Sequence, residues 1–202
     1  MSQVNVQARD RDGAMPTAWS KRRRFWLYGL ACSLWLSGVA HAGTGRAIVD
    51  EPAASAIEGD WLVASRDAII RISRAGDEFE GHIVWQLQDT YGPEDGPVLN
   101  GKTVTDRKNH DPAKRSLPLT GLKMLWGLHY HADGKLWKSG LVYDADNGRT
   151  YDCQIRMISP DRLKLRGYIG FSLLGGSTLW SRVTMTTPMH GGLPYVMHTT
   201  GE

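Results

Sequence analysis

Short segments in which polar and apolar residues alternate fill most of the chain from residue 61 to residue 183. In the segment 78–87, for example, Ile83, Trp85 and Leu87 share one face. Because this period of two comes with many β-branched and aromatic residues, it predicts β-strands rather than helices. Segments of the same kind are expected at 68–73, 78–87, 122–131, 135–143, 150–159, 162–167 and in a last run that ends at Val183.

Turn residues separate these segments at short intervals. Asp146, Asn147 and Gly148 form the strongest hairpin signal, because a tight hairpin turn needs positive φ angles that Asn and Gly adopt at little cost. Gly175 and Gly176 predict a bulge or tight turn within the last run. The sequence therefore predicts an all-β fold, an antiparallel meander of about eight short strands that closes into a small barrel and so leaves no exposed edge.

The connection before residue 122 does not follow this pattern. Asp111 and Pro112 are typical of a helix start, since Asp caps the first turn and proline fits its first position. Pro118 ends whatever begins there, so we expect one short helical turn at 112–117. Connections of roughly thirty residues in compact domains are usually functional lids or disordered segments. The prolines and the cap favour an ordered lid.

The first 42 residues have the pattern of a secretory signal peptide. Four cations at 21–24 precede an uncharged, mostly apolar run at 25–39, and Ala40 and Ala42 supply the small residues of a cleavage site. The run is short for a membrane span, which needs about 20 residues. We therefore expect cleavage and export to the periplasm or the medium, by the general route or the twin-arginine route. Met15 is an alternative start.

The remainder divides into three parts. Residues 43–58 are small, polar and without periodicity, as expected of a linker, and residues 59–183 form the barrel domain. The Gly-, Pro- and Thr-rich residues 184–202 are expected to be a flexible tail.

Charge argues against a nucleic-acid partner. The formal net charge is +3, but residues 1–42 hold six of the 24 basic groups and two of the 21 acidic ones. The rest of the chain therefore has 18 basic and 19 acidic groups, a net charge of −1, with the signs interspersed. Such a chain offers no broad positive field for DNA or RNA.

Cysteine and histidine give no sign of a cofactor. Cys153 is the only thiol after residue 42, so no internal disulfide can form, and its place in a strand pattern predicts a small buried hydrophobe. His129 and His131 share one strand face, as two metal ligands would, but no third ligand follows from the spacing. We predict neither a metal nor another cofactor.

The two ends of the expected domain carry a matching pair. Gly59 and Trp61 open the domain as Gly-x-Trp, and Trp180 and Arg182 close it. Lipocalin-like barrels characteristically begin with Gly-x-Trp, and the indole closes one barrel end beneath a basic side chain of the last strand. Trp61 and Arg182 are the candidates for this structural pair, as a cation–π contact.

Further motifs, in the same order along the domain, resemble the bacterial family called domain of unknown function 2147. They are Gly59-x-Trp61, Gly81-His-Ile-Val-Trp85, Asp106-x-x-Asn109-x-Asp111-Pro112-x-x-Arg115-x-x-Pro118-Leu-x-Gly121, Gly140-x-x-Tyr143-Asp, Gly148-x-Thr-Tyr151, Leu165-x-Gly-Tyr168 and Trp180-x-Arg182. The resemblance implies an exported, lipocalin-like β-barrel whose activity is unsettled. Members often carry a cysteine just before the Gly-x-Ile-Val-Trp motif, but Phe79 and Glu80 stand there in this chain. A redox role is therefore unsupported.

The polar residues of the long connection allow two interpretations. In the structural one, Asp and Asn cap turns and Arg115 pairs with a carboxylate, which pins the connection onto the barrel. In the functional one, they form a clamp at the barrel mouth for the head group of an apolar ligand. The candidate ligand-binding residues are Trp85, Asp106, Asn109, Asp111, Arg115, Trp137 and Tyr143.

On this basis the expected function is the binding of a small apolar or amphipathic molecule inside the barrel. This expectation depends largely on analogy of fold. An envelope interaction module with a filled barrel and a protein or cell-wall partner is the first alternative, since eight strands can enclose either a cavity or a packed core. A hydrolase is a distant alternative, because no activated nucleophile is evident and no catalytic residue is predicted.

Overall fold

The computed structural model describes residues 51–170, 175–187 and 193–198. The predicted signal peptide, residues 1–42, lies outside the described residues, as do residues 43–50 of the expected linker. The described strands are β1 (Gly59–Leu62), β2 (Ala68–Ala75), β3 (Glu78–Gln86), β4 (Lys123–His131), β5 (Leu136–Asp144), β6 (Arg149–Ser159), β7 (Arg162–Tyr168), β8 (Gly175–Met185) and β9 (Tyr195–Met197).

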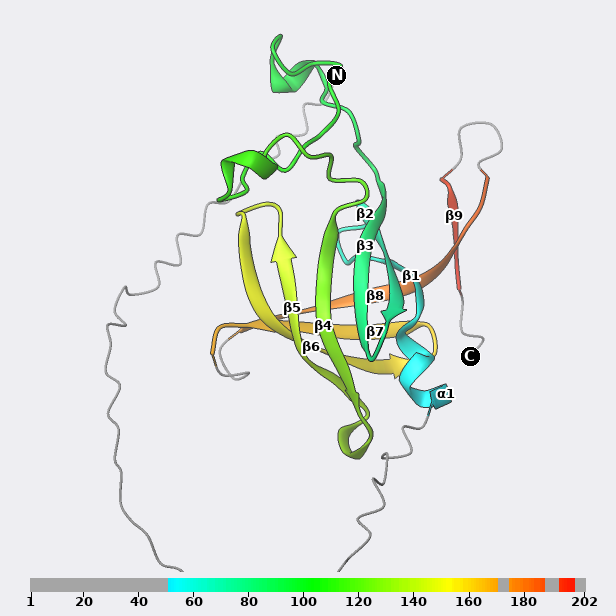
Figure 1. Cartoon of the computed structure of the whole chain (residues 1–202). Coiled ribbons are helices and arrows are strands. Elements are labelled where there is room, and N and C mark those ends of the chain that lie inside the picture. Colours follow the sequence, from blue (N-terminus) through cyan, green and yellow to red (C-terminus); the bar gives the residue numbers. More distant parts are fainter. Residues whose placement is uncertain (1–50, 171–174, 188–192, 199–202) are drawn as a thin grey trace, which may run out of the picture. The chain divides into compact units, whose positions relative to one another are not determined.

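The first eight strands form a closed antiparallel barrel (Figure 1). Each strand pairs with the next along the chain, and β1 also pairs with β8, where Trp61 lies opposite Arg182. The prediction of an all-β meander that closes into a barrel of about eight strands is confirmed. The closure joins both ends of the domain, so the Gly-x-Trp and Trp-x-Arg motifs become cross-strand neighbours.

A short helical segment covers one end of the barrel. It consists of α1 (Glu51–Ala54) and the 3-10 turn η1 (Ser55–Ile57), and we call it the plug. Trp61 Nε1 donates to Ile57 O at 2.8 Å, and Trp137 Nε1 donates to Ala54 O at 3.0 Å. This differs from the linker expected at 43–58, because Ala54 and Ile57 are buried. A single helical turn is too short to show a hydrophobic period in the sequence.

The other helical turns are 3-10 segments in connections. They are η2 (Pro93–Asp95) and η3 (Pro112–Lys114) in the long connection between β3 and β4, and η4 (Ala132–Gly134) between β4 and β5. Figure 1 shows the long connection at the end of the barrel away from the plug. Across the three described ranges, no helix has the length and hydrophobicity to cross a membrane.

Apolar side chains from every strand of the barrel fill the interior. Leu128 packs directly against the backbone of Gly140, which has no side chain. A Cβ atom on Gly140 would lie only 2.4 Å from Leu128 Cδ2. Cys153 belongs to this core, as predicted for a small hydrophobe. The buried members are Ala54, Ile57, Trp61, Ile70, Ile72, Phe79, Ile83, Leu125, Leu128, Trp137, Cys153, Ile155, Leu163, Leu165 and Trp180.

A smaller cluster lies on the outer face of the barrel. Tyr195 of β9 packs with Leu62, Ile69 and Val183, and its ring meets the ring of Trp85 edge to face at 5.5 Å. The end of β8 and β9 therefore differ from the flexible tail expected at 184–202. A three-residue strand in a Gly- and Pro-rich segment has too little pattern to be found in the sequence. Residues 188–192 and 199–202 of that tail lie outside the described residues.

Candidate functional site

The long connection is attached to the barrel through one buried carboxylate. Asp106 is 1% exposed. Its Oδ1 atom accepts a hydrogen bond from the Tyr143 hydroxyl at 2.7 Å, and its Oδ2 atom accepts one from Asn109 Nδ2 at 2.6 Å. Burial, together with the hydrogen bond to Asp106, raises the pKa of the Tyr143 hydroxyl above its ordinary value of 10.0. Tyr143 therefore stays a hydrogen-bond donor at neutral and mildly alkaline pH.

The neighbouring polar residues hold the turn that follows. The Asp111 side chain accepts from the backbone N–H of Ala113 at 3.0 Å and caps η3, as the Asp-Pro pair predicts. The helical turn ends at Lys114 and is shorter than the expected 112–117. Arg115 Nε donates to the backbone carbonyl of Asn109 at 2.7 Å, a different acceptor from the expected carboxylate. The long connection can pack closely against the hairpin at Gly148 because this residue has no side chain. A Cβ atom there would lie 2.0 Å from Lys108 O.

These residues lie against the outer face of β5. Val142 packs against the barrel core, so the next residue, Tyr143, points to the opposite face, where the connection covers it. The register shift between Trp137 and Gly140 sets this alternation. The structure thus brings together five of the candidate residues, which contact one another, the backbone of the connection and, through Asp111 at 3.8 Å, the Lys114 ammonium group: Asp106, Asn109, Asp111, Arg115 and Tyr143.

The two tryptophans of the candidate set lie elsewhere. Trp85 packs with Tyr195 on the outer face of the barrel. Trp137 is buried beneath the plug, where its indole N–H is already bonded to Ala54 O. Both residues therefore lie outside the Asp106 network.

Arg182 links the plug to the barrel. Its guanidinium lies 4.2 Å from the centroid of the Trp61 ring, so the structure brings the proposed barrel-end pair together. The guanidinium also donates to three backbone carbonyls, with Nη1 to Glu58 O at 2.6 Å, Nη2 to Ala56 O at 2.7 Å and Nε to Pro160 O at 2.9 Å. Burial lowers the pKa of Arg182, and the nearby carboxylate of Asp161 opposes this shift.

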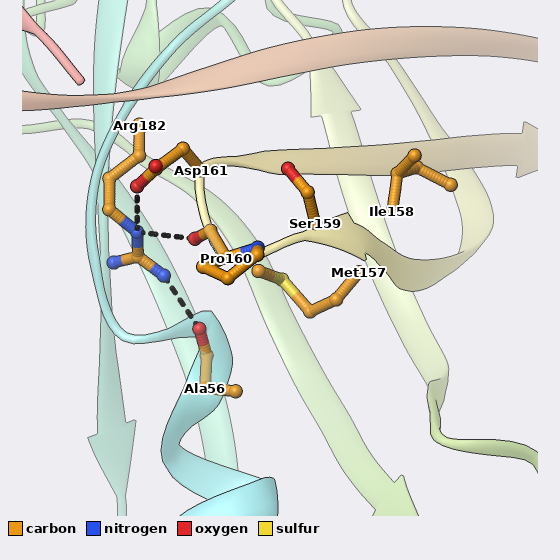
Figure 2. Close-up of a pocket in the computed structure, with 7 residues that line it drawn as sticks. All are labelled: Ala56, Met157, Ile158, Ser159, Pro160, Asp161 and Arg182. Atoms are coloured by element: carbon orange, nitrogen blue, oxygen red, sulfur yellow. Dashed lines mark hydrogen bonds and ion pairs between the residues drawn. The ribbon is translucent and has the colours of Figure 1, made fainter. Parts of the chain in front are cut away.

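Beside Arg182 lies an open hollow of about 620 Å³ (Figure 2). It runs between the plug and the turn that joins β6 to β7. Its walls are mostly apolar, and the buried Oγ atom of Ser159 has no hydrogen-bond partner among the described atoms. The lining residues are Ala56, Met157, Ile158, Ser159, Pro160, Asp161 and Arg182.

A second hollow of about 220 Å³ adjoins the first, since Ala56 and Met157 line both. Tyr130 and Trp137, whose ring centroids are 5.0 Å apart, give it an aromatic wall. Its remaining lining residues are Ala53, Lys135 and Arg156. We call the two hollows together the plug groove. No pattern in the sequence indicates this groove, because the plug that forms one of its walls was expected to be a linker.

The plug groove is therefore apolar along its length and differs in charge at its ends. Lys135 and Arg156 line one end, and Asp161 lies beside Arg182 at the other. Such a surface can accept an elongated apolar group and an acidic group at the basic end. Among the residues that the structure describes, no cluster of three His, Cys, Asp or Glu side chains could hold a metal ion.

A hydrogen-bonded chain lies next to the groove. His198 Nδ1 is 3.2 Å from Asp161 Oδ1, and His198 Nε2 is 2.7 Å from Thr184 Oγ1. The chain fastens β9 to the β6–β7 turn. A hydroxyl, an imidazole and a carboxylate in this order also occur in nucleophilic catalysis.

The closed barrel, the Gly-x-Trp strand beneath an arginine and the long connection between β3 and β4 are features of a lipocalin-like fold. In agreement, the chain is similar to a solved structure of HP1028 from Helicobacter pylori, a protein described as belonging to the lipocalin family, with a TM-score of 0.51. The two are 17% identical, and the similarity covers 63% of this chain and 82% of that one, so it concerns the fold alone.

The family follows from the sequence model that matches residues 59–182, more than half of the chain. This chain belongs to the DUF2147 family, whose description is an uncharacterized protein conserved in bacteria. No curated protein sequence matches the chain.

Proposed function

We propose that this protein binds a small amphipathic molecule with an acidic head group, and that the plug groove is its site. The main support for this proposal is the pair of adjoining hollows, of about 620 and 220 Å³, which have apolar walls and two cations at one end. The larger volume lies in the range of about 300–1,000 Å³ that is usual for small-molecule sites. The lipocalin-like fold supports a binding role in general.

The charges that line the plug groove favour an anionic ligand whose head group lies at the basic end. Within the part of the chain that the structure describes, Lys135 and Arg156 form neither a salt bridge nor a side-chain hydrogen bond, so their charges can be offered to a ligand. At the other end Arg182 lies 3.8 Å from the Asp161 carboxylate and balances its charge, so that end attracts an anion less than the basic end does. The head group would therefore bind beside Arg156, with the apolar part over Met157 and Ile158 toward Pro160.

The groove is preferred over the barrel interior for a steric reason. Beneath the plug, the interior is filled by fully buried side chains such as Trp61, Trp137 and Ile155. A ligand there would have to displace them, and deleting or moving one large core side chain costs about 2–5 kcal/mol. The same packed core suits the alternative of an interaction module, which would leave the groove without a small ligand.

Titration with dodecanoate, followed by tryptophan fluorescence and calorimetry, tests the proposal. We expect saturable binding, weakened about tenfold by Arg156→Gln, since one charge-assisted hydrogen bond is worth about 1.5–3 kcal/mol in favourable sites. Arg149→Gln, at the far end of the same strand, is the matched control and should bind as the wild type does. The dodecyltrimethylammonium cation should bind more weakly than the anion.

Two results would count against this function. Equal affinity of both variants for dodecanoate would remove the groove as the site. A protein recovered from cells without any small bound mass, and without affinity for either probe, would favour the interaction module.

Export is part of the proposal, supported by the cationic and apolar pattern of residues 21–42. The expected location is the periplasm or the medium. N-terminal sequencing of protein from the periplasmic fraction should begin at Gly43. Recovery of the uncleaved chain from the cytoplasm alone would contradict it.

A second candidate function is hydrolysis, for which the chain of Thr184, His198 and Asp161 is the motivating observation. If these three side chains are catalytic, the protein should cleave p-nitrophenyl butyrate, and both Thr184→Val and His198→Gln should abolish the cleavage. If the three side chains only hold β9 against the β6–β7 turn, neither variant should change the rate of cleavage, and both should lower the melting temperature.

A further inference from the structure

Cations gather on the outer face of the barrel at three consecutive strands. The inward side chains of these strands, such as Trp137, Ile155 and Leu163, are buried in the core. The intervening residues therefore point outward, and five of them are basic. We call this set the cationic face: Lys138 on β5, Arg156 on β6, and Arg162, Lys164 and Arg166 on β7.

Two of these cations face each other directly. Arg156 and Lys164 are cross-strand partners in the β6–β7 register. Like charges placed directly opposite in a sheet destabilise it. In the described ranges, neither of them nor Lys138 has a carboxylate partner. An anion that binds between Arg156 and Lys164 would reduce the repulsion between them and so stabilise the sheet.

Acidic side chains are concentrated elsewhere. On the outward positions of β5, β6 and β7, the acidic side chain is Asp152, which accepts a long hydrogen bond from Gly170 N at 3.4 Å. On the opposite side of the barrel, Asp60 pairs with Arg71 and Glu80 pairs with Lys123. The near-neutral domain is thus polarised, with ion-paired side chains on one side and, on the other, the cations Lys138, Arg156 and Lys164, which have no carboxylate partner among the described residues.

Exposed apolar side chains lie among the cations. Leu179 of β8 is 48% exposed and lies opposite Lys164 in the β7–β8 register. Ile158 is 55% exposed and follows Arg156 by two positions on the outer face of β6. Cations that attract anionic head groups and apolar side chains that reach the acyl boundary are together typical of surfaces that lie on a bilayer.

We propose that the cationic face docks onto the surface of an anionic lipid bilayer. A membrane is favoured over a soluble polyanion because Leu179 and Ile158 would be buried against lipid but not against a polyanion. The acidic side of the barrel would also repel a long polyanion that wrapped around it. Arg156 and Ile158 also line the plug groove, but Lys138, Lys164 and Leu179 do not, so variants at these three positions test the cationic face alone.

The test is sedimentation with vesicles, using protein cleaved after Ala42 so that the cations at 21–24 cannot contribute. This form keeps every residue of the two core clusters. The wild type should bind vesicles of phosphatidylcholine mixed with phosphatidylglycerol, and should not bind phosphatidylcholine alone. Binding should vanish at about 1 M salt, where the screening length falls to about 3 Å.

The double variant Lys138→Gln with Lys164→Gln should partition about 30-fold more weakly, because each cation near an anionic surface contributes about fivefold. Its melting temperature should be unchanged or higher, since the repulsion between Arg156 and Lys164 is gone. The matched control removes two exposed cations from the long connection, Lys102→Gln with Lys108→Gln, and should bind as the wild type does.

Three outcomes would overturn the proposal. The first is equal binding by both double variants, and the second is equal binding to vesicles with and without phosphatidylglycerol. The third has two parts: the protein binds heparin as tightly as it binds vesicles, and the double variant Leu179→Ala with Ile158→Ala binds vesicles as tightly as the wild type does. That outcome would identify a soluble polyanion as the partner instead. Loss of dodecanoate binding by Arg156→Gln bears on the groove and leaves this test unaffected.

Discussion

Replacing Tyr143 by phenylalanine removes one hydroxyl group from a buried site and keeps the shape of the ring. The hydroxyl lies 2.7 Å from Asp106 Oδ1, and the two residues are 8% and 1% exposed. A hydrogen bond to a charged group contributes about 1.5–3 kcal/mol, and here the carboxylate keeps only Asn109 as a side-chain donor after the change. We expect the free energy of unfolding to fall by about 2 kcal/mol and the melting temperature by about 7 °C.

Urea unfolding followed by tryptophan fluorescence measures this loss. Tyr151→Phe is the matched control, because its hydroxyl accepts from Asn147 Nδ2 at 3.0 Å at an exposed position, and it should cost less than about 0.5 kcal/mol. In the background Asp106→Asn, the same Tyr143→Phe change should cost much less, giving a coupling energy of about 1–2 kcal/mol. A coupling energy near zero would show that the pair does not hold the long connection.

The pH dependence supplies an independent check. The pKa of Tyr143 is raised in the folded protein above the ordinary 10.0, first by burial and then by Asp106. Above pH 10 an unfolded tyrosine ionises while the folded one stays protonated, so this contribution is complete below pH 10 and is lost as the pH rises further. The stability of Tyr143→Phe should lack this alkaline decline. The same slope in both proteins would refute the assignment.

Three further predictions concern the plug, the core and the thiol. Arg182→Lys keeps the charge but cannot reach three carbonyls at once, so it should lower the free energy of unfolding by about 3 kcal/mol and increase acrylamide quenching of tryptophan. Gly140→Ala should cost about 2 kcal/mol because its Cβ atom would overlap a buried leucine, whereas Gly176→Ala, with no atom within 4 Å, should be nearly neutral in the same urea experiment. Cys153 should react with a thiol reagent only on unfolding, since burial raises its pKa to about 12; rapid modification of native protein lacking Cys32 would contradict this.

The barrel could be predicted from the sequence because its signals are repeated. A period of two in seven segments and the Asp146, Asn147, Gly148 turn determine both the strands and the hairpins. Closure also had a local signal, since the motifs at Trp61 and Arg182 lie at the two strands that meet.

The site could be predicted only in part. The polar residues of the long connection do form one group, but the sequence does not show on which face of β5 they lie. That face depends on the register shift between Trp137 and Gly140, which moves Tyr143 outward. A bulge of this kind depends on packing across neighbouring strands, so no pattern along the chain reports it.

The plug groove could not be predicted because its walls come from distant parts of the chain. Ala56 precedes the barrel, Met157 lies on β6 and Arg182 on β8. Only the closed barrel brings them together. The cationic face has a weaker sequence signal, since the alternation of Arg162, Lys164 and Arg166 with leucines already places basic residues on one side of a strand.

The family match ends at residue 182, yet the folded unit does not. Two indole N–H groups donate to carbonyls at 54 and 57, before the matched region begins, and Tyr195 seals an apolar patch after it ends. A fragment cut at the matched limits would lack Val183 and Tyr195, expose Leu62 and Ile69, and leave both indoles without acceptors. Such a fragment should express poorly and aggregate. Family limits mark where the sequences agree, while in this protein each molecule uses its own flanking residues to finish the barrel.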